Sequence, residues 1–102
     1  MVSINTTFHV EDVIHLDFLA YIKQTYIANA LLDEYVRSAR LCKIHSHKVE
    51  EGHSYSVQFR FDSLDELEMW DKTQGKEHNE KLLLEFDNKI AGFSTLLEEI
   101  RL

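Results

Sequence analysis

Two histidines separated by one residue, His45 and His47, have a spacing that could support metal chemistry. Residues i and i+2 of a β-strand point to the same side, about 7 Å apart along the backbone, and imidazole nitrogens are common metal ligands. His9 is the candidate third ligand, but it comes from a distant segment of the chain. We therefore favour a polar surface over a metal site, and we expect no metal or other cofactor.

A glutamine and an arginine, Gln58 and Arg60, alternate with apolar residues in the segment from Tyr55 to Asp62. The planar guanidinium of Arg60 can hold a carboxylate through two hydrogen bonds, and the amide of Gln58 can orient the bound molecule. Histidines on the same face would make its charge depend on pH near neutrality. These residue types predict a site for a small anion.

Other catalytic signatures are missing from the sequence. It has no glycine-rich phosphate loop, no nucleophile elbow and no Cys-x-x-Cys pair, so phosphoryl transfer, serine-hydrolase and dithiol redox chemistry lack support. The single cysteine, Cys42, cannot form an internal disulfide, and we expect it on the core side of its strand as a small hydrophobe. No catalytic residue is assigned, although His9, His45 or His47 could act as an acid or a base.

The segments that position these side chains alternate between strands and helices. Apolar and polar residues alternate over residues 2–10, 41–49 and 55–62, which predicts three strands. A last strand begins near Ile90, and the side to which its residues point is ambiguous. Glu51 and Gly52 form the turn of a hairpin between the second and third strands.

Apolar residues at helical spacing predict two helices. The first is capped by Asp12 and runs to about Tyr35, and its apolar stripe places Tyr26 in the core. The second begins at Leu64, because Ser63-Leu64-Asp65-Glu66 has the form of a capping box. Gly75 breaks or bends this helix, and Trp70 belongs to the core rather than to a cofactor shelf.

The order of elements is βαββαβ, the ferredoxin-like split. The sequence therefore predicts a single α+β domain over residues 1–102, with a four-stranded antiparallel sheet and both helices on one face. A two-residue hairpin turn would place Ile44 opposite Phe59 and Cys42 opposite Phe61 on the side that the helices cover. The first strand neighbours the third in this fold, so polar residues of all three strands share the other side.

The predicted polar face consists of Asn5, Thr7, His9, Lys43, His45, His47, Ser56, Gln58 and Arg60. Within it, the residues expected to bind a ligand are Asn5, Thr7, His9, His45, His47, Gln58 and Arg60. The plainer alternative is a solvated outer face, because a sheet with helices on one side commonly exposes the other side to water. The specific hypothesis is that three histidines and an arginine make a locally positive region that suits a small anion.

Composition limits the classes of protein and partner. A chain of 102 residues with 44% hydrophobic residues is typical of one globular domain, and it has no run of about 18 apolar residues that could span a membrane. The net charge of -7 would repel nucleic acid. A basic stretch followed by an apolar run is missing from the N-terminal segment, so we expect a cytoplasmic protein.

Several segments also carry a resemblance to a known family. They are Asn5-Thr6-Thr7-Phe8-His9-Val10, Leu41 to Ile44, Tyr55-Ser56-Val57-Gln58-Phe59 and Phe93-Ser94-Thr95-Leu96-Leu97-Glu98-Glu99. Over nearly its whole length the chain resembles the uncharacterised domain-of-unknown-function 4286 family. Members of that family resemble the dimeric α+β barrel superfamily, in which two ferredoxin-like subunits pack their open sheet faces together. The resemblance implies the fold and a homodimer, but it implies no activity.

Three functional classes remain. The first is a dimeric module that binds a small ligand on the polar sheet face, and the second is a purely structural dimer. The third is a cofactor-independent enzyme of the monooxygenase-like type that the superfamily includes, although the polar face offers few of the apolar groups that an aromatic substrate needs. We rank the binding module first and the enzyme last.

Overall fold

The strands and helices follow one another in the predicted βαββαβ order. The computed structural model describes residues 1–45 and 51–102. The strands are β1 (Val2–Val10), β2 (Ser38–Ile44), β3 (His53–Phe61) and β4 (Ile90–Glu98). The first helical segment comprises η1 (Asp12–Ile14), α1 (His15–Tyr21), the π-helical turn η2 (Ile22–Tyr26) and α2 (Ile27–Ala30). The second comprises α3 (Leu64–Lys72), α4 (Gln74–Phe86) and η3 (Asp87–Lys89).

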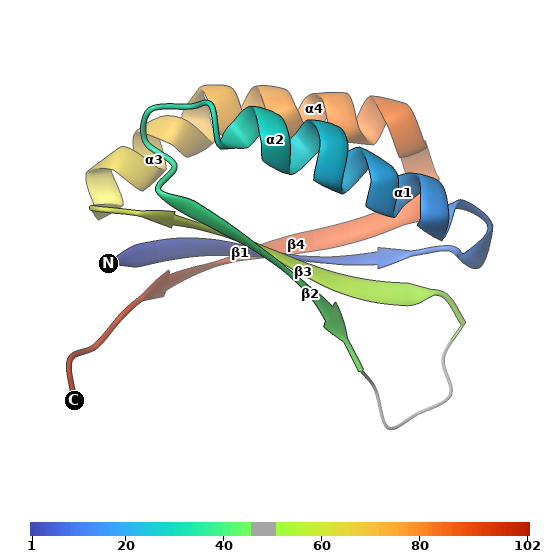
Figure 1. Ribbon diagram of the computed structural model, residues 1–102, viewed down its shortest axis with the longest axis horizontal. Coiled ribbons are helices and arrows are strands. Elements are labelled where there is room, and N and C mark those ends of the chain that lie inside the picture. Colours follow the sequence, from blue (N-terminus) through green and yellow to red (C-terminus); the bar gives the residue numbers. More distant parts are fainter. Residues whose placement is uncertain (46–50) are drawn as a thin grey trace.

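The strands form one antiparallel sheet in the order β2-β3-β1-β4. The helical segments lie together on one side of this sheet, and its other side is left open (Figure 1). This is the ferredoxin-like α+β arrangement, and it confirms that the first strand neighbours the third. Among the residues that the structure describes, no helix is both long enough and apolar enough to cross a membrane.

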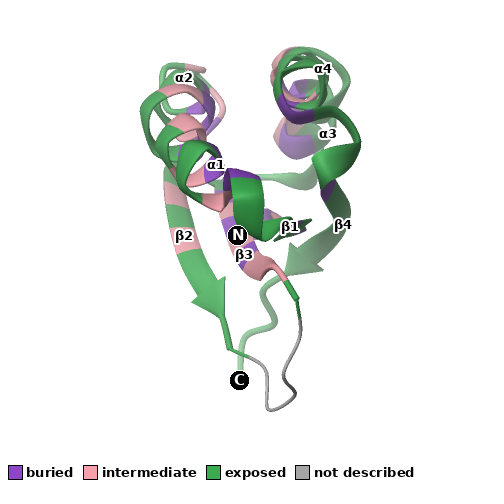
Figure 2. Ribbon diagram, turned by 90° about the vertical axis from the view of Figure 1, so that its right-hand side faces the viewer, coloured by how far each residue is buried: buried purple, intermediate pink, exposed green. Residues whose placement is uncertain are grey.

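Alternating residues of the central strands build the core between the sheet and the helices (Figure 2). The buried apolar residues of β1 and β3 are Val2, Ile4, Phe8, Val10, Tyr55, Val57, Phe59 and Phe61, as predicted. Tyr26 and Trp70 are also buried, which confirms their expected place in the core. The ring of Phe59 lies 5.8 Å from the ring of Tyr26 and 5.4 Å from that of Trp70, measured between centroids. These two rings link the sheet to both helical segments.

The first helical segment begins and ends differently from the prediction. Asp12 does not cap it, because the carboxylate of Asp12 lies 3.0 Å from Nε2 of His53 and no side-chain hydrogen bond caps the first turn. The last helical residue is Ala30 rather than a residue near Tyr35. Beyond it the backbone closes into a tighter turn, in which the N–H of Asp33 donates to the carbonyl of Ala30 (3.0 Å).

The second helical segment begins where the capping box predicts. Oγ of Ser63 accepts a hydrogen bond from the N–H of Glu66 (3.2 Å). Ser63 is therefore the N-cap, and helix α3 begins at Leu64. The break between α3 and α4 falls at Thr73, whose hydroxyl donates back to a carbonyl of α3 (2.7 Å). Gly75 lies in the first turn of α4, where a Cβ would come within 2.7 Å of the ring of Trp70. The glycine therefore allows a close approach and does not itself break the helix.

Pairing with β1 settles the facing of the last strand. Ile90 lies opposite Val10 and Leu96 opposite Ile4, so even-numbered residues of β4 face the helices. Phe93 and Leu97 point to the open side, because neighbouring residues of a strand alternate between faces. Of the strand's nine residues, only Ile90 is buried.

The register between β2 and β3 differs from the prediction by five residues. Ile44 lies opposite Ser54 instead of Phe59. Because five is an odd number, every side chain of β2 changes to the other face of the sheet. The cause is the length of the connection, which contains eight residues between Ile44 and His53 instead of a two-residue turn.

Candidate functional site

The side of the sheet that faces away from the helices, here called the open face, carries sixteen residues of the four strands. They are Ser3, Asn5, Thr7 and His9 of β1, Ser38, Arg40, Cys42 and Ile44 of β2, Ser54, Ser56, Gln58 and Arg60 of β3, and Ala91, Phe93, Thr95 and Leu97 of β4. Its centre is polar, and its larger apolar side chains lie on the two edge strands.

Hydrogen bonds already join several of the central polar residues. The hydroxyl of Ser56 donates to Oδ1 of Asn5 (2.5 Å), and Nδ2 of Asn5 lies 3.5 Å from Oγ1 of Thr7. Farther along the same strands, Nδ1 of His9 and Oγ of Ser54 are 2.8 Å apart. These contacts satisfy the middle of the open face internally, so the groups with unused hydrogen-bonding capacity lie elsewhere on it.

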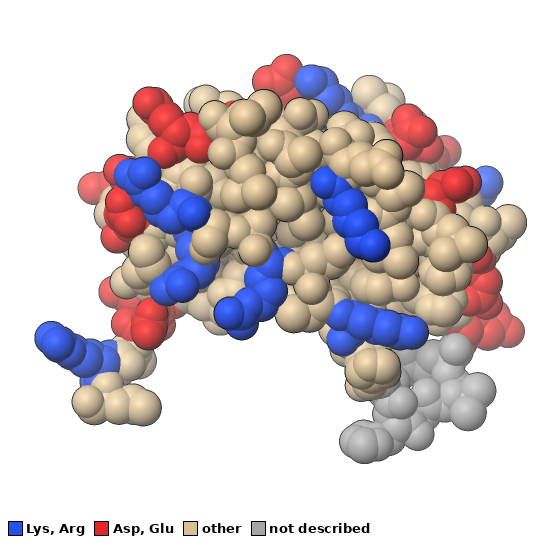
Figure 3. Space-filling view, in the orientation of Figure 1, with Lys and Arg blue, Asp and Glu red and all other residues tan. Residues whose placement is uncertain are grey.

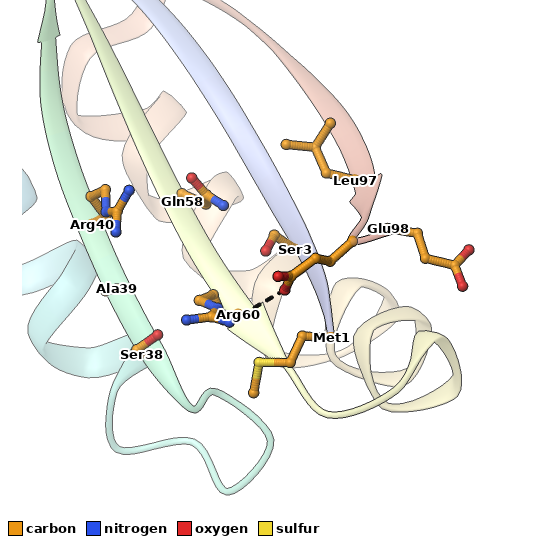
Figure 4. A pocket seen from close by; sticks show the side chains of 10 residues that line it. Met1, Ser3, Ser38, Ala39, Arg40, Gln58, Arg60, Leu97 and Glu98 are labelled. Carbon is orange, nitrogen blue, oxygen red and sulfur yellow. Dashed lines mark ion pairs between the residues drawn. The ribbon is translucent and has the colours of Figure 1, made fainter. Parts of the chain in front are cut away.

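A pocket of about 420 Å³ lies at the end of the open face where β1 begins and β3 ends. We call it the arginine pocket, and its polar lining residues on the open face are Ser3, Ser38, Arg40, Gln58 and Arg60. The side chains of Arg40, Gln58 and Arg60 come from the adjacent strands β2 and β3 and lie on the same side of the sheet (Figure 4). Gln58 lies directly opposite Arg40 in the strand register, and Arg60 opposite Ser38.

One carboxylate contacts this group of donors. Oε2 of Glu99 lies 3.8 Å from Nη2 of Arg60, the ion pair that the dashed line at Arg60 marks in Figure 4. The Glu99 side chain is 72% exposed. Charge-assisted hydrogen bonds are shorter, about 2.7–2.9 Å, so this contact is a loose ion pair. Within the described part of the chain, no carboxylate lies within ion-pair distance of Arg40. Glu98 also lines the pocket, and no ion pair joins it to either arginine in the described part of the chain. The two guanidinium groups therefore have one loose carboxylate contact between them.

The lining of the arginine pocket holds two arginines, Arg40 and Arg60, and two glutamates, Glu98 and Glu99, on a protein whose net charge is -7. In the view of Figure 3, lysine and arginine side chains gather across the middle of the molecule, and acidic side chains lie toward its two sides. Arg37 forms an ion pair outside the pocket, with its Nε 2.8 Å from Oδ2 of Asp62. An anion would find its two strongest donors in Arg40 and Arg60.

The structure separates the histidines from the arginine pocket. His9 lies at the opposite end of the open face, six residues along β1 from Ser3 in the pocket, which corresponds to about 20 Å in a strand. His45 follows the last residue of β2 and does not lie opposite Gln58 as predicted, because the register shift gives that place to Arg40. His47 lies outside the described residues. Arginines, and neither His9 nor His45, therefore line this pocket.

Two further histidines gather at the other end of the sheet. The rings of His15 and His53 stack with their centroids 3.8 Å apart, and Asp12 holds the second of them. Nδ1 of His15 is buried and has no hydrogen-bond partner among the described residues. Within those residues, no group of three or more His, Cys, Asp or Glu side chains could hold a metal ion.

The remaining predicted residues of the polar face divide between the two sides of the sheet. Lys43 lies opposite Tyr55 on the helix-facing side, where the prediction placed Cys42. Cys42 lies opposite Ser56 on the open face and is exposed, so its predicted place in the core is wrong. Arg40 and Ser38 replace Lys43 and His45 as the residues that β2 contributes to the open face.

Burial acts most strongly on a tyrosine of the helical layer. Burial raises the pKa of the Tyr26 phenol far above its ordinary value, and the charge of Asp71 raises it further. The neutral phenol donates to Oδ1 of Asn79 (2.7 Å). Nearby, Oδ2 of Asp33 accepts a hydrogen bond from Nε1 of Trp70 (2.9 Å). These polar contacts tie the two helical segments together.

Sequence analysis missed Ser3, Ser38 and Arg40 in the arginine pocket. Ser3 is the one buried polar residue of the described chain, at the start of a strand whose alternation was recognised. The signal for Arg40 was its place between Ala39 and Leu41, two apolar residues that face the helices. An earlier start for the second strand would have included it.

An antiparallel four-stranded sheet with one helix-covered face and one open face defines this chain as a ferredoxin-like α+β protein. The family model "Domain of unknown function (DUF4286)" matches residues 1–100. The chain therefore belongs to the DUF4286 family, as the sequence resemblance predicted. No curated protein matches it in sequence.

Solved structures support the same fold. An ethyl tert-butyl ether d (EthD) family protein from Bacillus halodurans has 15% sequence identity and a TM-score of 0.74, covering 98% of this chain and 100% of that chain. SnoaB, a cofactor-independent oxygenase from Streptomyces nogalater, has 13% identity and a TM-score of 0.70, covering 99% and 94%. A dimeric ferredoxin-like protein from an uncultured marine organism has 13% identity and a TM-score of 0.69, covering 97% of each chain. At these identities the similarity establishes the fold alone.

Proposed function

We propose that this protein is a homodimeric binding module that holds a small carboxylate in the arginine pocket. The observation that carries the proposal is the pocket of about 420 Å³ in which two guanidinium groups from adjacent strands lie beside an amide and two serines, with Glu98 and Glu99 at its C-terminal side. Of the original ligand-binding candidates, Gln58 and Arg60 line this pocket, and Arg40 joins them. Asn5, Thr7, His9 and His45 do not line it, and His47 lies outside the described residues.

Arg60 is the anchor of the proposed site. Its planar guanidinium can donate two parallel hydrogen bonds to a carboxylate, and Arg40 supplies a second positive charge on the neighbouring strand. The amide of Gln58 and the hydroxyls of Ser3 and Ser38 can orient the bound molecule. Glu99, at 3.8 Å, leaves the donors of Arg60 available to a ligand that approaches to ordinary hydrogen-bond distance.

A second copy of the chain is the proposed cover for the open face. Phe93, Leu97 and Ile44 are 66%, 46% and 39% exposed on its edge strands, and exposed apolar groups of this kind mark interaction surfaces. A symmetric pair of subunits can bury both copies of such a face in one contact. The dimeric ferredoxin-like protein of similar fold supports this arrangement.

The enzyme hypothesis ranks below the binding module. A cofactor-independent reaction needs an acid or base at the substrate. Among the described residues, no histidine lines the arginine pocket, and its acid or base candidates are the carboxylates of Glu98 and Glu99, of which Glu99 already contacts Arg60. Relatives of similar fold include proteins described as antibiotic biosynthesis monooxygenases, at 13% identity. A purely structural dimer remains the second candidate, because exposed Phe93 and Leu97 favour association whether or not a ligand binds.

Calorimetric titration with succinate at low salt tests the anion site. We expect binding to the wild-type protein and its loss in Arg60→Ala, with partial weakening in Arg40→Ala. Arg37→Ala is the matched control, because it removes an arginine that pairs with Asp62 outside the pocket. Equal affinity of wild type and Arg60→Ala for succinate, or no binding to either, would contradict the proposed site.

Sedimentation equilibrium tests the dimer. At micromolar concentration we expect a mass about twice the 12.0 kDa of one chain, and Phe93→Asp should reduce it to that of the monomer. Leu84→Asp is the control, since Leu84 is an exposed apolar residue on the helical layer, away from the open face. A single 12.0 kDa species for the wild-type protein would refute the dimer.

A further inference from the structure

A second cavity lies on the helix side of the sheet, between α4 and the edge strand β4. It has a volume of about 260 Å³, and we call it the helix-side cleft. Its position is independent of the arginine pocket, because the two cavities share no lining residue and lie on opposite faces of the sheet. It therefore poses a separate question about what this protein binds.

Small residues on two strands create the cleft. Thr6 interrupts the apolar alternation of β1, and it lies opposite Ser94 of β4 on the side that faces the helices. The next pair along is Phe8 with Gly92, where a Cβ on the glycine would come within 3.0 Å of the Phe8 ring. The sheet therefore presents a hollow to α4 at a place where the other strands present large apolar side chains.

Polar groups are concentrated at one part of the cleft. Oγ1 of Thr6 and Oγ of Ser94 lie 2.9 Å apart, so one hydroxyl of the pair donates to the other. Asn79 of α4 also lines the cleft, and its Oδ1 accepts the hydroxyl hydrogen of Tyr26 (2.7 Å). Among the hydrogen bonds of the described residues, none has Nδ2 of Asn79 as its donor. A hydroxyl pair and an amide group thus line the same small space.

Apolar side chains form the rest of the lining. Phe8, Leu82 and Ile90 are buried around the cleft, and Leu83 and Phe93 are exposed beside it. Among the residues that the structure describes, no Lys, Arg, His, Asp or Glu lines it. A charged ligand would lose hydration there without gaining an ionic partner, which is unfavourable.

We infer that the helix-side cleft binds a small uncharged molecule that is mostly hydrocarbon and carries one carbonyl group, such as a ring-bearing amide. Nδ2 of Asn79 would donate to the carbonyl oxygen, and the hydroxyls of Thr6 and Ser94 would accept from or donate to the polar end. The apolar walls would cover the ring. A cleft of about 260 Å³ lies just below the usual range of drug-sized pockets, which favours a molecule with a single ring.

Benzamide and benzoate form a matched pair of probes for this inference, because they share one ring and differ in charge. In a ¹H–¹⁵N correlation spectrum, benzamide should shift the signals of Thr6, Gly92, Ser94 and the Asn79 side-chain amide. The expected dissociation constant is about 1 mM, typical of a fragment with few heavy atoms. Benzoate should leave these signals in place at the same concentration.

Three variants locate the binding. Ser94→Leu fills the cleft and should weaken benzamide binding by about tenfold or more. Thr6→Val removes one hydroxyl at nearly constant shape and should weaken it by a smaller factor. Thr95→Val is the control, because Thr95 does not line the cleft and points to the open side. The affinity of this variant for benzamide should match that of the wild type.

The results separate this inference from its alternatives. Benzamide shifts that persist unchanged in both Ser94→Leu and Thr6→Val, or no shifts at Thr6 and Ser94 in the wild type, would overturn it. Equal binding of benzoate at these residues would overturn the assignment to an uncharged ligand. If Ser94→Leu fails to fold, as judged by its thermal melt, Thr6→Val and the wild-type spectra still decide the outcome.

Discussion

The two sides of the central strands β1 and β3 are held together by different interactions. On the helix side, the ring of Phe59 packs between Tyr26 and Trp70 at centroid distances of 5.8 and 5.4 Å. On the open side, partly exposed side chains form hydrogen bonds across the strands, as Ser56 does with Asn5. Burial of a large apolar side chain stabilises a protein by about 1.5–3 kcal/mol, and an ordinary hydrogen bond by about 1 kcal/mol. The helix side therefore supplies most of the stability, which leaves residues of the open side free to bind.

Truncation of Phe59 gives the largest expected difference between the two sides. Phe59→Ala should lower the free energy of unfolding by about 3–5 kcal/mol, because it removes a buried ring and leaves a cavity. Urea denaturation measures this change. Gln58→Ala is the control on the open side of the same strand and should cost less than about 1 kcal/mol. Equal losses in the two variants would show that the open side contributes as much to stability as the core.

Removal of Asp33 tests whether polar contacts matter more in the helical layer than on the open face. Oδ2 of Asp33 lies 2.9 Å from both Nε1 of Trp70 and Nε2 of His78, and the Asp33 and His78 side chains are 16% and 14% exposed. Asp33→Ala should destabilise the protein by about 1.5–3 kcal/mol, the usual range for hydrogen bonds to charged groups. Chemical denaturation followed by Trp70 fluorescence measures it. Asp62→Ala, which breaks an exposed ion pair, should cost no more than about 1 kcal/mol.

Tyr26 predicts a loss of stability in alkali. Burial raises the pKa of its phenol above the ordinary value of 10.0. Above that pH the unfolded chain releases a proton that the folded protein keeps, so the unfolded state binds fewer protons and stability falls as pH rises. Tyr26→Phe should cost about 0.5–1.5 kcal/mol at pH 7 through the lost bond to Asn79, and it should flatten this alkaline decline.

The measurement for Tyr26 is the urea midpoint of both proteins between neutral pH and strong alkali. Tyr35→Phe is the control, because Tyr35 is another tyrosine at a less buried position. A decline of the same steepness in wild type and Tyr26→Phe would assign the alkaline loss to other groups.

The smallest effect belongs to the hydrogen bonds at the centre of the open face. Asn5→Ala should change the free energy of unfolding by less than about 1 kcal/mol, since water can replace the contact with Ser56 in a partly exposed site. Thermal melting measures it. A loss as large as that of Asp33→Ala would mean that the open face is as tightly coupled to folding as the helical layer.

Sequence patterns were sufficient wherever one element carried its own signal. The alternation of apolar and polar residues from Tyr55 to Phe61 predicted which side chains of β3 face the helices and which face the open side. The pattern was sufficient because the helices bury one side of this strand. Ser63 predicted the start of α3 because its hydroxyl oxygen accepts from the N–H of Glu66, only three residues along the chain. Local interactions of this kind can be inferred from spacing alone.

The candidate site needed information that spacing does not contain. The side of the sheet to which each β2 residue points depends on the number of residues that connect β2 to β3. Because the register shifts by an odd number of residues, Arg40 takes the place predicted for His45, opposite Gln58 on the open side. Gly52 did adopt a left-handed conformation, with φ of 86°, as a turn glycine would, but it closes a longer connection than a hairpin turn. Of the polar residues that line the arginine pocket on the open face, the sequence therefore predicted Gln58 and Arg60 but not Ser3, Ser38 and Arg40.

The π-helical turn η2 explains a regularity in the first helical segment. From α1 to α2, the buried residues Phe18, Ile22, Tyr26 and Ala30 are spaced by four residues at every step. In an α-helix each such step rotates the side chain about 40° past a full turn, so four residues in this series would spiral off one face. The π-helical turn η2 is wider, so each residue in it rotates by less than in an α-helix, which offsets part of this rotation. Tyr26 thereby stays on the buried face, where its hydroxyl donates to Oδ1 of Asn79. Deletion of one residue within η2 would shorten the spacing, and the side chains after it would be rotated away from the sheet by about a quarter of a turn or more.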